Sequence, residues 1–329
     1  MKKLELVQRP RRNRINSNIR DLVSETHLTV ENLILPVFVA EGLAQKTEIK
    51  TMPGQFRHSE NSLLQDMHES LNLGIKVFAL FPALKGQSKN QKASESINPQ
   101  GFQAQIIKKI KSEFPNITLI TDVALDPFSS DGHDGFVENN KIINDETVFR
   151  LTEMAVLQAQ CGADIVAPSD MMDGRIGEIR RALDDHGFID TGILSYSAKY
   201  ASSFYGPFRD ALDSAPKSGD KKTYQMDFRN RREAIREVML DIEQGADMVM
   251  IKPALSYLDI ISDVKKISSV PVAAYNVSGE YAMIKAAHAA GMIDETKAMV
   301  ETLYSIKRAG ADIILTYFAK DMSKWLRGG

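Results

Sequence analysis

The chain has 329 residues, 43% of them hydrophobic and 26% charged, and its 41 basic and 43 acidic side chains leave a formal net charge of −2. This length and composition suit one α/β barrel or two smaller domains, and they exclude a disordered chain and a small disulfide scaffold. A charge so close to zero argues against a dedicated nucleic-acid binder, which normally carries a basic excess.

Cysteine usage and hydropathy bear on the compartment of the protein. Cys161 is the only cysteine, so neither an internal disulfide nor a cysteine-rich zinc site can form. The sequence contains no run of about 18 apolar residues, which predicts no membrane span. The basic N-terminus is not followed by an apolar segment and therefore does not predict a secretory signal. We expect a cytoplasmic protein.

The first 30 residues differ in character from the rest of the chain. They are polar and basic, contain Pro10 and have few apolar positions. We expect residues 1–30 to form an extended arm that packs against a partner surface or stays disordered.

Eight short apolar runs follow the arm, and each is nearly continuously apolar rather than alternating. Such runs are typical of strands that are buried on both faces of a parallel sheet. The runs are Leu33–Ala40, Lys76–Pro82, Thr118–Leu125, Asp164–Ser169, Gly192–Ser197, Met248–Pro253, Pro271–Val277 and Asp312–Tyr317.

Most gaps between these runs have the apolar spacing of helices, most clearly Glu146–Gln160 and Arg231–Gln244. The buried stripe of the second helix is predicted to contain Ala234, Ile235, Val238, Met239 and Ile242. The same three-residue phrase, Gly-Ala-Asp, stands at the end of three of these gaps, just before a predicted strand. Its glycine is expected to end a helix in the left-handed αL conformation. The phrase occurs at Gly162-Ala163-Asp164, Gly245-Ala246-Asp247 and Gly310-Ala311-Asp312.

The alternation of eight strands with helices predicts the fold class. It favours an α/β protein, a (β/α)₈ TIM barrel over residues 31–329. A doubly wound sheet is the second choice, although neither G-x-G-x-x-G nor a Walker sequence is present. In a barrel, the chemistry is expected at the carboxyl ends of the strands.

Two lysines stand at predicted strand ends. Lys252 follows four apolar strand residues, and Lys199 follows the fifth run. Desolvation and a second ammonium both lower the pKa of an amine, and a neutral amine attacks a ketone to form a Schiff base. The alternative is that each lysine extends its ammonium into water at the end of the strand.

Two loops add charged groups near the same predicted end of the barrel. Tyr200–Tyr224 lacks strong periodicity, which predicts either a lid or a disordered segment. Its cations Arg209, Lys221 and Lys222 could meet a ligand carboxylate, but the residues alone favour plain surface charge. The third run contains Asp122 and leads into a loop with Asp126, Asp131, His133 and Asp134, where either a hard-cation site or an ordinary polar turn is possible.

Longer segments carry a resemblance to a known family. They are RPRRNR, DVALDPFSSDGHDG, APSDMMDGRIGEIR, SYSAKYASSFYGPFRDA, GDKKTYQMD, GADMVMIKPALSYLDII, YNVSGEYAMI and ILTYFAKD. Over essentially its whole length the sequence resembles the porphobilinogen synthases, also called δ-aminolevulinic acid dehydratases. The resemblance implies a barrel with an N-terminal arm that condenses two molecules of 5-aminolevulinate to porphobilinogen, with loss of two waters, in tetrapyrrole synthesis.

The resemblance also implies roles for individual residues. Lys252 matches the lysine that forms a Schiff base with the substrate supplying the propionate side, and Lys199 matches the lysine that handles the second substrate. Asp122 and Ser169 match residues around the reacting centre. The residues that match substrate-binding positions are Arg209, Lys221 and Gln225 for the second substrate, and Ser278 and Tyr317 for the carboxylate of the first. The usual family assembly is a homo-octamer of arm-exchanging dimers.

The metal is where this sequence departs from many members of the family. Zinc-dependent members carry three cysteines where this chain has Ala124, Asp126 and Asp134, so no zinc is expected. The two aspartates offer hard oxygen ligands, which favour Mg²⁺ or no tightly held metal. Glu237 matches a glutamate that holds a largely hydrated, allosteric Mg²⁺ in Mg²⁺-stimulated members, whereas its position on a polar helix face alone predicts a solvated side chain. No organic cofactor is expected.

Two other functions compete with this one. A Schiff-base aldolase on the same barrel needs one reactive lysine and often a phosphate site, so the second lysine and the cationic lid count against it. A non-catalytic scaffold or small-molecule binder would have only solvated lysines.

Overall fold

The computed structural model describes residues 4–328, so residues 1–3 of the predicted arm and Gly329 lie outside the described part of the chain. A parallel sheet in the strand order β12-β11-β10-β9-β8-β5-β4-β1 closes on itself, because β1 also pairs with β12. The barrel strands are β1 (Leu33–Ala40), β4 (Val77–Ala83), β5 (Thr118–Val123), β8 (Ile165–Pro168), β9 (Gly192–Lys199), β10 (Met248–Lys252), β11 (Val272–Asn276) and β12 (Ile313–Thr316).

Each barrel strand begins and ends within two residues of a predicted run. The prediction of a (β/α)₈ barrel is therefore confirmed, and the doubly wound alternative is wrong because an open sheet has no pairing between its first and last strands. Short strands outside the barrel form two hairpins, β2 (Thr47–Glu48) with β3 (Phe56–His58) and β6 (Phe136–Glu138) with β7 (Lys141–Ile143).

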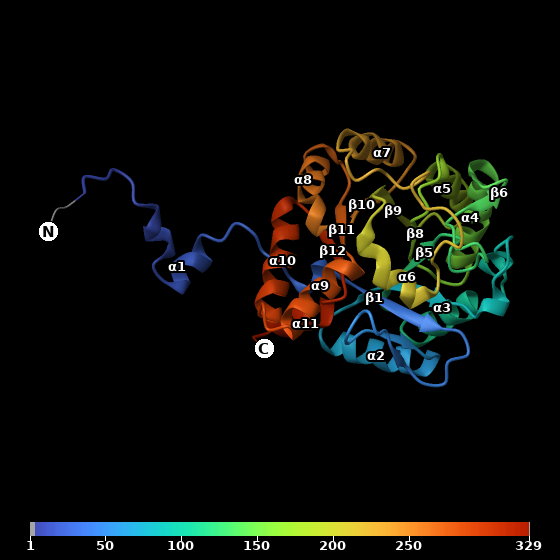
Figure 1. Cartoon of the computed structure of the whole chain (residues 1–329), viewed down its shortest axis with the longest axis horizontal. Helices are drawn as coiled ribbons and strands as arrows, with labels where there is room; N and C mark the ends of the chain where they lie inside the picture. Colours follow the sequence, from blue (N-terminus) through green and yellow to red (C-terminus); the bar gives the residue numbers. More distant parts are fainter. Residues whose placement is uncertain (1–3, 329) are drawn as a thin grey trace.

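Helices surround the barrel (Figure 1). They are α2 (Glu60–Asn72), α3 (Phe102–Glu113), α4 (Asn144–Gln160), α5 (Arg175–Asp185), α6 (Gly206–Leu212), α7 (Arg232–Glu243), α8 (Leu258–Ile267), α9 (Ser278–Ala289), α10 (Glu295–Ala309) and α11 (Ala319–Leu326). Short 3₁₀ helices occur at η2 (Val30–Asn32), η3 (Gly86–Ser88), η4 (Ser94–Ile97), η5 (Ser203–Tyr205) and η6 (Leu255–Tyr257). Within residues 4–328, every helix is too short or too polar to span a membrane.

The two helices predicted most clearly are α4 and α7, but the buried stripe of α7 differs from the prediction. Met239 is 38% exposed, whereas Asp241 is buried with Ala234 and Val238. Asp241 can be buried because its carboxylate accepts hydrogen bonds from the guanidinium of Arg175, at 3.3 Å, and from the hydroxyl of Ser195, at 2.6 Å.

The three Gly-Ala-Asp phrases share one geometry. Their glycines have φ of +105° at Gly162, +101° at Gly245 and +124° at Gly310, values that are positive but larger than the αL value of about +57°. A positive φ as predicted is thus present, although the conformation is not αL. These backbones favour glycine because a side chain would be strained there.

The aspartates of these phrases hold neighbouring strands together. Each lies just before a strand and accepts a hydrogen bond from a backbone N–H of the preceding barrel strand. The bonds are Leu119 N–H to Asp164 (2.7 Å), Ile193 N–H to Asp247 (2.7 Å) and Val272 N–H to Asp312 (2.9 Å). Lys111 and Lys265 also pair with Asp164 and Asp312, at 2.8 and 2.7 Å. The repeated phrase is therefore a strand clamp at the amino end of the barrel.

Residues 4–27 extend away from the barrel (Figure 1). This segment contains η1 (Pro10–Arg14) and α1 (Ser17–Leu22), and neither buries a side chain. Leu28 is the first buried residue of the described chain. The segment corresponds to the predicted arm, and it makes no core of its own.

Candidate active site

Lys252 and Lys199 end adjacent strands, β10 and β9, and stand opposite each other in the sheet register. Both are buried, with 5% and 6% of their surfaces exposed. The register shifts by one residue between Val249 and Ile251, and without this irregularity Lys252 would pair with Ala198 instead. Because a one-residue slip turns a side chain to the other face of a strand, the shift is what brings the two lysines together.

Lys252 lies in an aromatic enclosure formed by four rings. Its Nζ is 4.5 Å from the ring centre of Tyr275, 4.9 Å from Phe208 and 5.1 Å from both Tyr196 and Tyr205. Burial, followed by the nearby ammonium of Lys199, lowers the pKa of Lys252 to about 7. A substantial share of the amine is therefore unprotonated near neutral pH.

Lys199 has surroundings of the opposite kind. Its ammonium donates to the backbone oxygen of Ser169 and lies 3.3 Å from Asp134. The second oxygen of Asp134 is 2.5 Å from Lys221, which also lies 3.4 Å from Asp126. Burial raises the pKa of Asp134, but Lys199 and Lys221 outweigh it and hold that pKa well below its usual range. Asp134 is thus a carboxylate shared between two ammonium groups.

Asp122 on β5 is a buried carboxyl group whose pKa lies near neutral pH. Burial, and then the negative charge of Asp126, raise the pKa of Asp122 to about 7, against the opposing effect of Lys199 and Lys252. A carboxyl group with this pKa can both give and take a proton near neutral pH.

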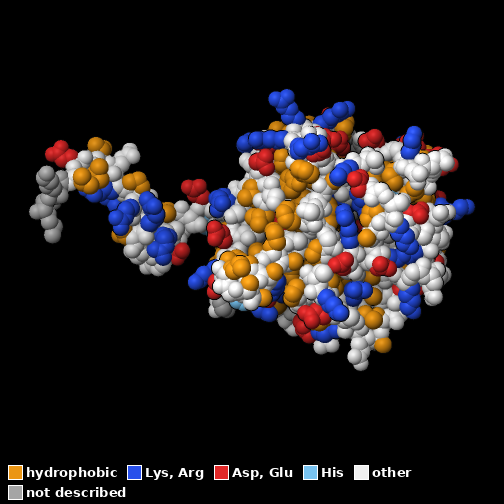
Figure 2. Space-filling view, in the orientation of Figure 1, with side chains coloured by type: hydrophobic (Ala, Val, Ile, Leu, Met, Phe, Trp, Pro, Cys, Tyr) orange, Lys and Arg blue, Asp and Glu red, His pale blue; other side chains and the backbone are white. Residues whose placement is uncertain are grey.

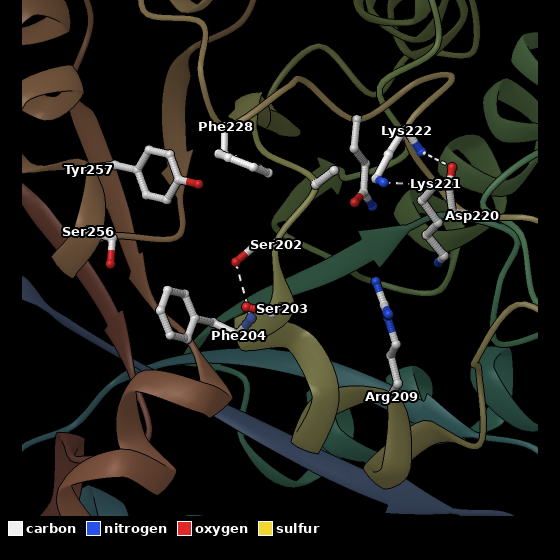
Figure 3. Close-up of a pocket in the computed structure, with 12 residues that line it drawn as sticks. Ser202, Ser203, Phe204, Arg209, Asp220, Lys221, Lys222, Phe228, Ser256 and Tyr257 are labelled. Carbon is white, nitrogen blue, oxygen red and sulfur yellow. Dashed lines mark hydrogen bonds and ion pairs between the residues drawn. The ribbon is translucent and has the colours of Figure 1, made fainter.

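A cavity of about 620 Å³ opens beside α6 (Figure 3). Figure 3 shows the nitrogen atoms of Arg209, Lys221 and Lys222 on one side and the rings of Phe228 and Tyr257 on the other. Gln225, which is 3% exposed, also lines the cavity. The side-chain oxygen of Gln225 accepts no hydrogen bond from residues 4–328. The structure therefore brings Arg209, Lys221 and Gln225 to one cationic cavity.

The two residues predicted to hold the first substrate are placed differently. The hydroxyl of Tyr317 is 2.7 Å from that of Tyr275, which belongs to the enclosure of Lys252. Ser278, at the start of α9, donates to the backbone oxygen of Phe204 at 3.2 Å and accepts from the backbone N–H of Phe208 at 3.0 Å. Tyr317 is thus linked to the enclosure, whereas the hydroxyl of Ser278 is already engaged with η5 and α6.

Glu237 does not lie on a fully solvated helix face. It is half-buried on α7 and lines a second cavity, of about 480 Å³, together with Glu233, Asp173, Asn140 and Asn144. Burial and then Asp241 raise the pKa of Glu237, as expected for a carboxyl group among other carboxylates. Among residues 4–328, no three His, Cys, Asp or Glu side chains converge to hold a metal ion. Asp126 and Asp134 instead contact the ammonium of Lys221.

The sequence did not single out the aromatic residues around Lys252. Tyr196 and Tyr275 lie within predicted strands, and Tyr205 and Phe208 lie in the segment predicted to be a lid. Tyr196, Tyr205 and Phe208 are near one another in sequence, but Lys252 and Tyr275 follow much later in the chain, so only the folded barrel brings the four rings to the lysine. The one available sequence signal for the enclosure was the presence of Tyr196 and Tyr275 within apolar runs.

The fold and the site together define a class: a (β/α)₈-barrel enzyme with two buried lysines and a cationic cavity at the carboxyl ends of its strands. The family model for delta-aminolevulinic acid dehydratase matches residues 7–325. The chain therefore belongs to the delta-aminolevulinic acid dehydratase family.

Individual relatives agree with this assignment. The chloroplastic delta-aminolevulinic acid dehydratase of Oryza sativa is 52% identical over 99% of this chain and 76% of its own length. The enzyme of Bradyrhizobium diazoefficiens is 49% identical over 98% of this chain and 92% of its own length. The crystal structure of the Toxoplasma gondii enzyme in complex with the reaction product porphobilinogen superposes with a TM-score of 0.96, at 51% identity, over 98% and 92% of the two chains.

The plant relatives correct one expectation. Enzymes of rice, Selaginella martensii, Physcomitrium patens and Arabidopsis thaliana, 50–52% identical to this chain, are chloroplastic. The prediction of a cytoplasmic location is therefore wrong. It rested on a single cysteine and on the lack of a secretory signal, and these features do not separate one reducing compartment from another.

Proposed function

We propose that this chain is a porphobilinogen synthase that uses Lys252 and Lys199 as Schiff-base amines. The reaction is the condensation of two molecules of 5-aminolevulinate to porphobilinogen, with loss of two waters, in porphyrin biosynthesis. Family membership and the product-bound relative support the overall reaction. The observation that carries the proposed chemistry is the pair of buried lysines on adjacent strand ends, only one of which is enclosed by aromatic rings.

The first covalent step belongs to Lys252. Its neutral amine attacks the ketone carbon of the first substrate, and the carbonyl oxygen becomes the hydroxyl of a carbinolamine. That hydroxyl leaves as water when it receives a proton, and the nitrogen lone pair closes the C=N bond. Asp122, with a pKa of about 7, is the group proposed to exchange these protons, and Ser169 lies beside it. Burial and the neighbouring ammonium of Lys199 disfavour the protonated amine and so favour attack.

The first substrate is held by its carboxylate. We assign this contact to the hydroxyls of Tyr317, which follows β12 and contacts Tyr275, and Ser278, which begins α9 and contacts Phe208. Ser278 must give up its hydrogen bond to Phe204 in order to donate to the substrate. The contact therefore couples binding of the first substrate to η5 and α6.

The second substrate occupies the cationic cavity. Arg209 and Lys221 meet its carboxylate, and the free side-chain oxygen of Gln225 accepts a hydrogen bond from the amine of this substrate or from a bound water. Lys199 then forms the second Schiff base. Residues 200–224 act as the lid over this cavity, since they supply both α6 and the loop that carries Lys221.

A magnesium ion at Glu237 is proposed as an allosteric activator. The single carboxylate of Glu237, in a cavity that Asn140 and Asn144 also line, suits a hard cation that keeps most of its waters. Activity should rise with Mg²⁺ and resist zinc-selective chelators. Glu237→Ala should lose the stimulation and keep basal turnover, whereas Glu243→Ala, an exposed change at the end of the same helix, should keep both. Tightly bound zinc whose removal abolishes activity would contradict this proposal.

The arm is proposed to build a homo-octamer by exchange between subunits. Apolar side chains are interleaved with basic ones along the arm (Figure 2), and Leu4, Leu6, Val7, Ile15 and Leu22 are each at least 50% exposed. Such residues gain stability only against another surface. Removal of residues 1–27 should leave a folded barrel of lower mass in sedimentation equilibrium, and an unchanged mass would contradict the arm as the assembling element.

One experiment tests the proposed function against its rivals. The pure protein is incubated with 5-aminolevulinate, the pyrrole product is measured, and a parallel sample is reduced with borohydride and mapped. A porphobilinogen synthase forms the pyrrole and carries the reduced adduct on Lys252. An aldolase would give an adduct without a pyrrole, and a non-catalytic binder would give neither.

A further inference from the structure

We infer that His133 is a positioning residue that latches the lid so that Lys221 and Gln225 reach the second substrate. The inference rests on the function proposed above. His133 is 4% exposed and lies in the loop after β5, outside residues 200–224. Both of its ring nitrogens nevertheless contact the lid. Nε2 is 2.9 Å from the backbone oxygen of Ser218, and Nδ1 is 3.1 Å from the hydroxyl of Tyr224.

The partners decide which atom donates in each bond. A carbonyl oxygen only accepts, so Nε2 carries the proton and donates to Ser218. In a neutral ring Nδ1 then accepts, and the hydroxyl of Tyr224 donates to it. That hydroxyl also accepts from the backbone N–H of Asp134, at 3.4 Å. Burial, and then Asp134, raise the pKa of Tyr224 well above its usual value, so the hydroxyl keeps the proton it donates. Every group in this short chain of bonds has a partner of the right kind.

The backbone on either side of His133 strengthens the contact with the lid. The N–H of Lys217 donates to the backbone oxygen of Asp131 at 3.1 Å. Gly132 has a φ of +71°, and a Cβ atom there would stand 2.3 Å from the backbone oxygen of Ala215. Only glycine allows the two loops to approach this closely. The loop therefore grips the lid at residues 215–218 and again at Tyr224.

Tyr224, the second contact with His133, lies in the same turn as two residues proposed to bind the second substrate, Lys221 and Gln225. The backbone N–H groups of Tyr224 and Gln225 both donate to the backbone oxygen of Lys221, at 3.4 and 2.9 Å. Anchoring Tyr224 thus sets the position of Lys221 and Gln225 at the cavity. It also brings Lys221 to Asp134, the carboxylate that Lys199 contacts. The latch consequently links the position of residues 215–224 to the second lysine, and neither of the His133 contacts involves a ring of the enclosure of Lys252.

Four variants test the latch. His133→Leu removes both bonds, His133→Gln places an amide nitrogen where Nε2 stood, His133→Asn keeps an acceptor near Nδ1, and Tyr224→Phe removes the hydroxyl alone. His186→Leu, at an exposed histidine at the end of α5, is the matched control. We expect His133→Leu and Tyr224→Phe to raise the half-saturating concentration of 5-aminolevulinate by up to about tenfold, the equivalent of one buried hydrogen bond, with a smaller change in maximal rate.

Rescue and coupling separate a latch from a purely structural residue. His133→Gln and His133→Asn should each recover part of the loss, and the His133→Leu/Tyr224→Phe pair should be less than additive because both changes break the same contact. Amide exchange of residues 215–224 should speed up in His133→Leu, and borohydride trapping on Lys252 should persist. A normal half-saturating concentration in both His133→Leu and Tyr224→Phe would overturn the latch, as would strictly additive effects. Absence of trapping in the unmodified protein would instead overturn the proposed function.

Discussion

Lys252 and Lys199 are the same residue type at the ends of adjacent strands, yet they have opposite surroundings. Four aromatic rings enclose Lys252, whereas Lys199 contacts a carboxylate and a backbone oxygen. Burial and the neighbouring charge of Lys199 lower the pKa of Lys252, whereas Asp134 and the backbone oxygen of Ser169 hold the side chain of Lys199 in position. The comparison teaches that two lysines in one barrel can be given different tasks by their neighbours alone.

The sharpest test of this difference removes each amine in turn. Lys252→Met should abolish borohydride trapping and reduce pyrrole formation on the order of 10⁴-fold or more, because a nucleophile is lost. Lys199→Met should also stop pyrrole formation but leave the adduct on Lys252. Peptide mapping of the reduced protein distinguishes the two variants. Equal trapping in both would mean that the lysines are interchangeable.

The next largest effect concerns stability. Asp134→Asn leaves two buried ammonium groups without their shared carboxylate, which should lower the free energy of unfolding by about 3–5 kcal/mol. Asp220→Asn, which removes an exposed partner of Lys222, should change it by less than about 0.5 kcal/mol. Denaturant titration at pH 7 measures both variants. A small effect at Asp134 would show that the carboxylate is not what retains the two charges.

The pH dependence of trapping sharpens the comparison further. Burial and Lys199 lower the pKa of Lys252 to about 7, so the amine needed for attack is lost as the pH falls through that value. Trapping in the unmodified protein should therefore decline below about pH 7. In Lys199→Met the like charge is gone, so the pKa of Lys252 rises and the decline should begin at a higher pH. An unchanged profile would mean that Lys199 has no influence on its neighbour.

The smallest effect is expected inside the aromatic enclosure. Tyr275→Phe keeps the ring next to Lys252 but removes the hydroxyl that lies 2.7 Å from Tyr317. The loss of one hydrogen bond should cost about 0.5–1.5 kcal/mol in thermal or denaturant unfolding, with trapping on Lys252 preserved. A cost as large as that expected for Asp134→Asn would erase the distinction between an apolar and an ionic enclosure.

The barrel strands could be predicted because burial on both faces leaves a continuous apolar run in the sequence. The pairing of Lys252 with Lys199 could not, since it depends on a one-residue irregularity between β9 and β10 that no local pattern encodes. The predicted buried face of α7 is wrong at Met239 and Asp241 for a similar reason. Only the folded chain places Arg175 where it can neutralise a buried aspartate.

The candidate site was predicted in part. Strand-end lysines and a cationic loop are visible as departures from the surrounding pattern, so Lys252, Lys199 and Lys221 stood out. The aromatic enclosure is invisible because a tyrosine in an apolar run looks like any other core residue. The engaged hydroxyl of Ser278 and the twofold contact of His133 with the lid involve atoms more than 60 residues apart in sequence. Spacing along the chain carries no information about such contacts.

The clamps of the Gly-Ala-Asp phrases divide six of the eight barrel strands into two-stranded modules. They join β5 to β8, β9 to β10 and β11 to β12, and they recur on every second strand. The ladders within the modules are longer than those at the two seams between them, where β8 meets β9 and β10 meets β11. Lys199 and Lys252, the two proposed Schiff-base lysines, belong to one module, β9 with β10. Local unfolding that separates neighbouring modules would therefore leave β9 paired with β10, and the two lysines would stay next to each other.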